Sequence, residues 1–312
     1  MVISTDALPG QEVGQAKRSR KSGGRRFGPY LVMLPALLFL FAVSVAPLIY
    51  SLVVSLQRYN LMNPDRRGFV ALRNYTLILE SPDFWNSLFV TFQFVVIAVG
   101  LELVLGLTLA IVLSRDVPGI AVFRSFLLVP LAMAPVVVGL LWRFMLNTEA
   151  GILNYLISLI GFDRSDFLSN TTWAMPIIAL VDVWQWTPFM FLILLAGIQA
   201  LPHEPFEAAA IDGATTRQTL IHILLPMLRY PILVAVLLRT IDAFRVYDLI
   251  YMMTRGGPVD ATNTLSWSVY NDGFRTFNMG YASALSWVML IIVTVVVTVF
   301  IRLIAGRRQS PA

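Results

Sequence analysis

Four charged side chains lie in an otherwise apolar run, LVAVLLRTIDAFRVYDLIYMM, which extends from Leu233 to Met253. They are Arg239, Asp242, Arg245 and Asp248. A charge at the centre of a membrane-spanning helix costs about 2.5–3.5 kcal/mol on insertion scales, so each needs compensation. The i, i+3 spacing sets each arginine beside the aspartate that follows it and allows ion pairs. Two hypotheses stay open: the pairs fix helix packing, or they line a path across the membrane.

The lining hypothesis selects one face of this helix. The residues at i, i+3, i+4 and i+7 are Arg239, Asp242, Ala243 and Val246, which share that face. An arginine fork and a carboxylate form hydrogen bonds with vicinal hydroxyl groups. Arginine is also a preferred partner of phosphate and sulfonate, so an anionic ligand is an alternative to a neutral one.

A second apolar run, VDVWQWTPFMF, combines Asp182 with the aromatic residues Trp186 and Phe189. Aromatic rings near a membrane edge commonly serve packing or an interfacial belt, but their faces also stack on the C–H faces of sugar rings. A carboxyl group at this depth needs a polar neighbour. Glu102 lies in a further apolar run without an evident partner, and we expect it to serve packing.

The composition predicts the type of secondary structure that carries these residues. Hydrophobic residues make up 57% of the 312 residues, charged residues 13%, and the mean hydropathy is +0.74, whereas about 25% of a soluble domain is charged. A helix of about 20 apolar residues crosses a bilayer. We therefore predict an all-α integral membrane protein with six transmembrane helices. Their expected ranges are Tyr30 to Leu56, Ser87 to Leu113, Val122 to Met145, Trp173 to Ile198, Leu228 to Met253 and Tyr281 to Ile304.

An even number of spans places both termini on one side of the membrane. Assigning that side to the cytoplasm puts 13 of the 23 Lys and Arg residues there and eight outside, in accord with the positive-inside rule. We expect a basic, disordered tail at residues 1–29 that contacts anionic lipid. A transmembrane domain at 30–305 and a C-terminal tail at 306–312 follow. The predicted location is the cytoplasmic (inner) membrane of a bacterium, with both termini in the cytoplasm.

Signatures of catalysis are missing from the sequence. It contains no cysteine, no phosphate-binding GxxxxGK[ST], and neither GxSxG nor HExxH. His203 and His222 lack metal-ligand spacing. We predict no catalytic residue, no metal, no cofactor and no nucleic-acid partner. A membrane-embedded enzyme and an ion-coupled carrier remain as alternatives, although the sequence shows neither the repeated halves nor the broken helices typical of carriers.

A polar, alanine-rich stretch interrupts the apolar sequence within the predicted cytoplasmic loop at 199–229. It reads EAAAIDGATTRQTLIHILLP, from Glu207 to Pro226. Acidic residues near its start and a glycine in the middle predict a short helix that ends at Gly213. Thr215 or Thr216 then caps a second helix, and Pro226 is expected to change the chain direction.

This stretch resembles the EAA loop of ATP-binding-cassette importer permeases. The pattern is Glu-Ala-Ala, three residues, Gly, nine residues, then Ile-x-Leu-Pro, and every defined position is filled. The resemblance implies a coupling helix seated on a cytoplasmic ATPase subunit, which would bind ATP and magnesium. It implies coupling roles for Glu207, Ala208, Ala209 and Gly213.

The segment from Val246 to Ser286 is similar to carbohydrate permeases of the maltose type. It carries Thr254, Gly256-Gly257-Pro258 and a Gly-x-Ala-x-Ala motif that begins at Gly280. The similarity extends from about Pro29 to the last span. The chain lacks the extra N-terminal spans and large external domain of the maltose-specific permease, so it matches the shorter, six-span members.

This similarity implies a substrate, a site and a set of partners. The substrate would be an oligosaccharide, a disaccharide or a polyol, with an anionic sugar or a glycerol phosphoester as the alternative. The residues expected to line its path are Trp186, Phe189, Arg239, Asp242, Ala243 and Val246. The expected partners are a second permease in a heterodimer, two ATP-binding cassette subunits and an external solute-binding protein.

Overall fold

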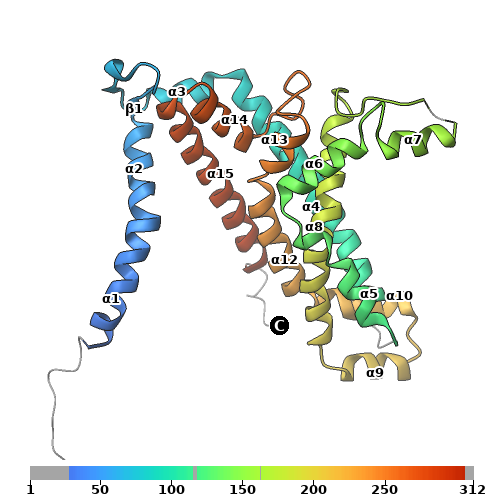
Figure 1. Cartoon of the computed structure of the whole chain (residues 1–312). Coiled ribbons are helices and arrows are strands. Elements are labelled where there is room, and N and C mark those ends of the chain that lie inside the picture. The colour runs from blue at the N-terminus through green and yellow to red at the C-terminus, as the bar shows by residue number, and fades with distance from the viewer. Residues whose placement is uncertain (1–27, 115–117, 162, 306–312) are drawn as a thin grey trace, which may run out of the picture. The chain divides into compact units, whose positions relative to one another are not determined.

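The computed structural model describes residues 28–114, 118–161 and 163–305, and these form mainly helices (Figure 1). The chain divides into two compact units, residues 1–50 and 51–312. The described part of the first unit consists of α1 (Gly28–Leu40), the π-helical η1 (Phe41–Val45) and the beginning of α2 (Ala46–Ser55). The predicted C-terminal tail lies outside the described residues, as does all of the N-terminal tail up to residue 27.

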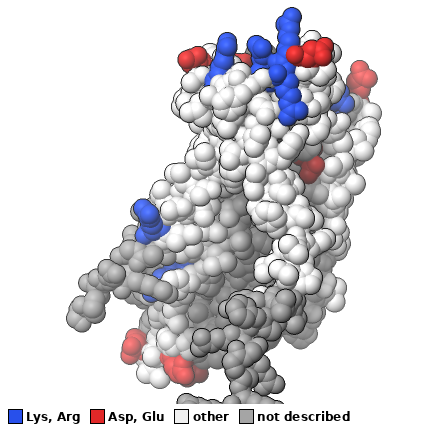
Figure 2. Space-filling model, turned by 90° about the vertical axis from the view of Figure 1, so that its left-hand side faces the viewer, with Lys and Arg blue, Asp and Glu red and all other residues white. Residues whose placement is uncertain are grey.

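Long apolar helices dominate the described part of the chain, as predicted. Four are long and apolar enough to cross a membrane: Met33–Ser55, Pro82–Val112, Ala174–Gln199 and Met279–Arg302. They correspond to the predicted first, second, fourth and sixth spans. On the face shown in Figure 2, many of the described charged side chains gather at the top and bottom of the view, and a few lie among the mostly uncharged side chains between them.

The predicted third span is broken. Instead of one helix from Val122 to Met145, the chain forms α5 (Ile120–Leu127), the 3-10 turn η3 (Pro130–Ala132) and α6 (Pro135–Met145), with a bend of 93°. Pro135 sets the start of α6, whereas Val129, which precedes Pro130, keeps helical backbone angles. Proline lacks an N–H donor, and it disfavours the helical region for the preceding residue. Ala134, just before Pro135, accordingly has extended backbone angles.

The predicted fifth span is also interrupted. Helix α12 (Arg229–Ala243) ends, and α13 begins only at Asp248 and continues to Met253. Two side chains satisfy carbonyl groups that the interruption leaves free, since Thr264 Oγ1 donates to Val246 O and Ser266 Oγ to Phe244 O, both at 3.3 Å. The expectation of unbroken helices was therefore wrong, and Val246 lies between two helices instead of on the face of one.

Helices α4 (Pro82–Val112) and α8 (Ala174–Gln199) pack along each other, and α12 packs against both (Figure 1). Gly106 permits the close approach, because a Cβ atom there would lie 2.6 Å from Met190 Cβ. Gly100, on the same helix, faces open space. Helix α8 continues through Pro188 without interruption. The apolar core thus holds the helices that carry Glu102, Asp182 and Arg239.

Short elements gather at one end of the second unit. The strands β1 (Gln57–Arg58) and β2 (Gly68–Phe69) pair antiparallel, with Gln57 opposite Phe69. The short helices are η2 (Pro64–Arg66), α3 (Arg73–Glu80), α7 (Ile152–Leu159), α14 (Leu265–Tyr270) and the π-helical η5 (Asn271–Arg275). Helix α15 (Met279–Ala305) begins there, and the Gly280 N–H donates to Tyr59 O at 2.9 Å.

The alanine-rich stretch forms the predicted pair of short helices at the opposite end (Figure 1). Helix α9 (Glu204–Ile211) leads to Gly213 in a left-handed conformation, φ +71°, as expected. Thr215 and Gln218 form a capping box at the start of α10 (Thr216–Thr219). The helix continues as the π-helical η4 (Leu220–Leu224) and α11 (Leu225–Met227).

The chain changes direction later than predicted. The bend of 64° falls between Met227 and Arg229, not at Pro226. A π-helical turn precedes the proline and adapts the backbone to the missing N–H, so the helix passes through it.

Candidate functional site

Arg239 lies at the junction of three helices. Its side chain is 1% exposed, and its Nε and Nη2 atoms donate to the two carboxylate oxygens of Glu102 on α4, at 2.7 and 3.0 Å. Its Nη1 atom donates to Asp242 Oδ2 at 2.8 Å, one turn along α12. Nη2 also donates to Asp182 on α8. One guanidinium thus connects α4, α8 and α12.

The role expected for Glu102 was wrong. Instead of serving apolar packing without a partner, it is the bidentate partner of Arg239, and it is fully buried. Removing one member of a buried ion pair costs about 3–5 kcal/mol, because the other charge stays buried and unpaired. The signal in the sequence was the carboxyl group itself, since a charge at this depth requires a cation.

The two ion pairs expected in the fifth span have different outcomes. The pair between Arg239 and Asp242 is confirmed. The pair between Arg245 and Asp248 is not formed, because every ion pair in the described part of the chain involves Arg239. The interruption after Ala243 removes the helical geometry on which that pair depends.

A cavity of about 80 Å³ borders this network. The side chains around it include five of the six predicted path residues, namely Trp186, Arg239, Asp242, Ala243 and Val246. Phe189 is not part of its wall; its ring packs edge-on against Trp186, with 6.1 Å between the ring centroids. The structure therefore brings residues of α8, α12 and the α12–α13 interruption to one place.

The residues around the cavity differ in how far their side chains are exposed. Arg239 and Ala243 are each 1% exposed, whereas the side chain of Asp242 is 48% exposed. Trp186 is half-buried, and the Arg239 guanidinium lies over its ring, 4.9 Å from the centroid. A ligand in the cavity would meet Asp242 and Trp186 first, while Arg239 holds both from behind.

Gln185 adds a polar group that the predicted site did not include. The residue is 1% exposed and borders the cavity, and its Nε2 atom donates to Met133 O at 3.0 Å. Its Oε1 atom has no hydrogen-bond partner among the described residues. A buried amide oxygen without a partner is costly. The i, i+3 spacing from Asp182 was the available signal.

Arg245 also borders the cavity. Its side chain is exposed and has no ion pair within the described residues. It therefore presents a free positive charge, in contrast to the fully engaged Arg239.

The predicted coupling residues lie on or next to α9. Glu207, Ala208 and Gly213 are exposed, whereas Ala209 is 7% exposed and its carbonyl accepts the Ala214 N–H at 2.9 Å. Ile211 is 86% exposed, which is unusual for a large apolar side chain. The segment from α9 to α11 (Glu204–Met227), called the elbow below, thus presents a carboxylate, small residues and one apolar side chain to its surroundings.

The described residues contain no group of three or more His, Asp or Glu side chains placed to hold a metal ion.

Comparison with known proteins identifies the family. Residues 102–309 match the family described as binding-protein-dependent transport system inner membrane component. The chain belongs to this family. It is a non-catalytic permease subunit of an ATP-binding-cassette importer, and a partner ATPase hydrolyses the ATP. The predicted resemblance to importer permeases and the multi-pass membrane architecture are confirmed.

Individual relatives transport sugars and a sugar-like phosphoester. The chain is 37% identical over 280 residues to the trehalose/maltose permease MalF of Thermococcus litoralis, covering 90% of this chain and 94% of the relative. It is 36% identical over 274 residues to the trehalose permease SugA of Mycobacterium tuberculosis, covering 88% and 87%. It is 35% identical over 266 residues to the sn-glycerol-3-phosphate permease UgpA of Rhizobium meliloti, covering 85% and 90%.

A solved structure shares the fold. A chain of the bacterial alginate ABC transporter, in complex with a periplasmic protein bound to alginate pentasaccharide, superimposes with a TM-score of 0.78. The match covers 91% of this chain and 96% of that one, at 19% sequence identity.

Proposed function

We propose that this permease subunit forms one side of the transmembrane path for a neutral sugar, such as a disaccharide, an oligosaccharide or a polyol. One observation carries the proposal. At the cavity, Arg239 is surrounded by three carboxylates, while the buried Gln185 Oε1 atom has no partner among the described residues. Such a wall accepts hydrogen bonds and carries no net positive charge.

A neutral, hydroxyl-rich substrate suits this wall. Sugar hydroxyl groups would donate to the exposed carboxylate of Asp242, and a sugar ring would stack on Trp186. Like charges within a few ångströms repel, so three carboxylates around one guanidinium disfavour an anion. The trehalose and maltose permeases among the relatives support this substrate class.

The size of the cavity supports a shared path. It encloses about 80 Å³, whereas ligand pockets commonly enclose about 300–1,000 Å³. One chain therefore supplies only part of the wall. In the proposed assembly a second permease supplies the facing part, and an external binding protein delivers the sugar.

The elbow connects the path to the ATPase. The helix from Thr216 to Met227 continues, after a bend of 64°, into α12, which carries Arg239 and Asp242. In our proposal two ATPase subunits bind ATP and magnesium, close together and move α9 through Glu207, Ala208 and Gly213. Helix α12 then moves with the elbow and changes access to the cavity. In this proposal the elbow and both termini lie in the cytoplasm.

One observation favours a second substrate class. Arg245 is an exposed cation at the cavity without an ion pair among the described residues, and arginine binds phosphate and sulfonate groups well. An anionic sugar or a glycerol phosphoester is therefore the alternative. The relatives for sn-glycerol-3-phosphate and sulfoquinovosyl glycerol belong to this class.

Purification of the tagged chain from mild detergent tests the proposed assembly. We expect a second permease and an ATPase to co-purify. ATP hydrolysis by this complex should rise when binding protein loaded with trehalose or maltose is added, and not with the empty binding protein. A chain that purifies alone, or hydrolysis that responds only to an anionic solute, would contradict the proposal.

A further inference from the structure

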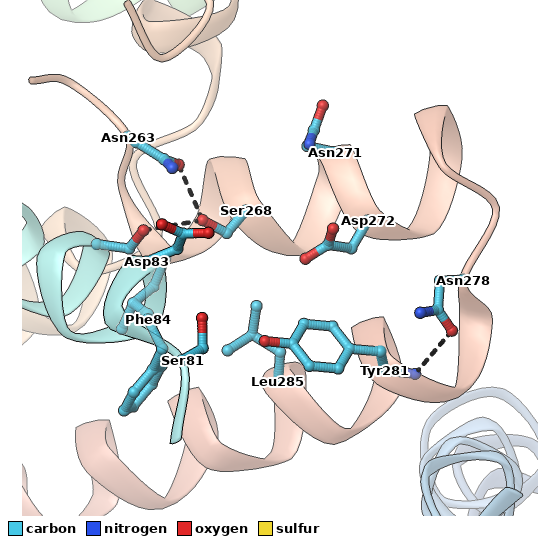
Figure 3. A pocket seen from close by; sticks show the side chains of 12 residues that line it. Ser81, Asp83, Phe84, Asn263, Ser268, Asn271, Asp272, Asn278, Tyr281 and Leu285 are labelled. Atoms are coloured by element: carbon cyan, nitrogen blue, oxygen red, sulfur yellow. Dashed lines mark hydrogen bonds between the residues drawn. The ribbon is translucent and has the colours of Figure 1, made fainter. Parts of the chain in front are cut away.

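A second, larger pocket lies at the end of the second unit opposite to α9. It encloses about 280 Å³, and its wall combines the start of α4, the segment α14–η5 and the start of α15 (Figure 3). Its polar side chains include Ser81, Asp83, Ser268, Asp272, Asn278 and Tyr281. None of these residues borders the cavity at Arg239.

Two carboxylates at this pocket lack partners. Asp83 belongs to the first turn of α4 and Asp272 to η5. Neither side chain accepts a hydrogen bond, and neither pairs with a cation, among the described residues. In Figure 3 both carboxyl groups lie at the same pocket.

Neutral groups at the same pocket are satisfied by one another. Ser268 Oγ donates to Asn263 Oδ1 at 2.8 Å and lies 3.1 Å from Ser87 Oγ (Figure 3). Ser87, Ser268 and Asn263 are therefore hydrogen-bonded to one another, whereas the carboxylates of Asp83 and Asp272 are not hydrogen-bonded within the described residues.

The charged form of the Asp272 carboxyl group is destabilised at this pocket. Burial, assisted by the charge of Asp83, raises the pKa of Asp272 to about 6. From the elements packed around it, the titratable groups at the pocket are Asp83 on α4 and Tyr281 on α15. A cation placed between the two carboxylates would stabilise the charged form of both.

The size of the pocket and the residues of its wall favour an organic cation over a single metal ion. A single metal ion fills a small fraction of about 280 Å³, and the described residues there include no group of three His, Asp or Glu side chains placed to hold one. Phe84 and Leu285 also border the pocket and are 5% and 2% exposed. Lysine and arginine combine an apolar stem with a charged head, and this combination matches an apolar wall beside carboxylates.

We propose that this pocket receives a lysine or arginine side chain of the external binding protein. The inference rests on the proposed function, which places this end of the chain outside the membrane and supplies the partner. Because the wall comes from α4, α14–η5 and α15, an inserted side chain contacts three separate segments at once. Docking would thereby fix their relative positions at the outer end.

The absence of cysteine from the sequence provides a clean test. Ser81→Cys introduces a single thiol at the pocket, and Ser165→Cys provides an exposed control elsewhere. In the assembled importer, with cysteine-free partners, each thiol is labelled with a trimethylammonium-ethyl and with a sulfonatoethyl methanethiosulfonate. We expect the ratio of cationic to anionic labelling rates to be on the order of tenfold higher at position 81 than at position 165.

Two further measurements identify the occupant. Saturating binding protein should block labelling at position 81 and leave position 165 unchanged. The pair Asp83→Asn and Asp272→Asn should abolish the charge preference and weaken docking of the binding protein about tenfold, as expected for loss of a charged contact. The pair Asp65→Asn and Glu80→Gln removes the same charge from exposed positions outside the pocket and should leave docking unchanged.

The outcomes separate this inference from the proposed function. Full labelling at position 81 under saturating binding protein, with sugar uptake intact, overturns the docking role alone. Protection by arginine amide but not by the binding protein assigns the pocket to a free organic cation and also overturns it. An assembly that neither binds a binding protein nor takes up sugar overturns the proposed function, and the inference with it.

Discussion

Arg239 and Glu102 are 137 positions apart in the chain, yet their side chains form a bidentate ion pair with nitrogen–oxygen distances of 2.7 and 3.0 Å. The pair joins α12, which follows the elbow, to α4, which begins at the pocket that contains Asp83 and Asp272. A single buried contact therefore lies between the two ends of the proposed transport machinery.

This pair should be needed for stability as well as transport. Arg239→Ala leaves Glu102 and Asp182 buried without a cation, so we expect a loss of about 3–5 kcal/mol and less assembled complex. Thermal unfolding in detergent measures it. Combining Arg239→Gln with Glu102→Gln should be less harmful than the two single changes added together. Strict additivity would contradict the coupling.

The contact between α4 and α8 predicts a difference between two glycines of one helix. Gly106→Ala should lower the unfolding temperature, because its Cβ atom would lie 2.6 Å from Met190 Cβ. Gly100→Ala is the matched control, since nothing lies within 4 Å of its Cβ position, and it should be neutral or stabilising by up to about 1 kcal/mol. Equal effects of the two substitutions would refute the close approach.

The elbow predicts uncoupled variants. Glu207→Lys reverses an exposed charge on α9, and we expect ATP hydrolysis without sugar uptake, because the contact with the ATPase is altered while the fold is unchanged. Gly213→Asp should act similarly, with added strain of about 1–2 kcal/mol from the left-handed backbone. The control is Glu204→Lys, an exposed acidic residue on the same helix outside the EAA pattern. Wild-type uptake by Glu207→Lys would sink the coupling role.

The acidic pocket predicts a pH dependence with a defined sign. The pKa of Asp272 is raised in the folded protein to about 6, mainly by burial. Because this carboxyl group ionises at a lower pH in the unfolded protein than in the folded one, its contribution to the free energy of unfolding is complete below about pH 4. That contribution is lost as the pH rises through about 6. Asp272→Asn removes this dependence, so its stability relative to wild type should increase between about pH 4 and 6 and then level off. A difference independent of pH would contradict the shift.

Apolar length and the EAA pattern predicted much of the molecule correctly. Four spans, the turn at Gly213 and the cap at Thr215 agree with the structure because each depends on residues near one another in the sequence. The site agrees in part, since the cavity gathers five of the six predicted path residues.

The remaining features depend on contacts between distant segments. Hydroxyl groups of Thr264 and Ser266, which follow in a later segment of the chain, donate to carbonyl groups at the interruption after Ala243. The periodicity of the sequence around Ala243 does not indicate these contacts. The same holds for the partner of Glu102, which lies on another helix. The pairing of Arg245 with Asp248 failed for the same reason, because it assumed a helix that tertiary contacts interrupt.

ATP-driven uptake into proteoliposomes that contain the assembled importer and its binding protein tests the central claim most directly. Uptake of labelled trehalose and maltose is compared with that of glycerol 3-phosphate, for wild type, Asp242→Asn and Arg245→Gln. We expect wild type to take up the neutral sugar. Asp242→Asn should reduce this uptake about tenfold or more, because a tenfold change corresponds to about 1.4 kcal/mol, which is what one hydrogen bond provides. Arg245→Gln should retain the uptake. Uptake restricted to glycerol 3-phosphate and abolished by Arg245→Gln would contradict the account.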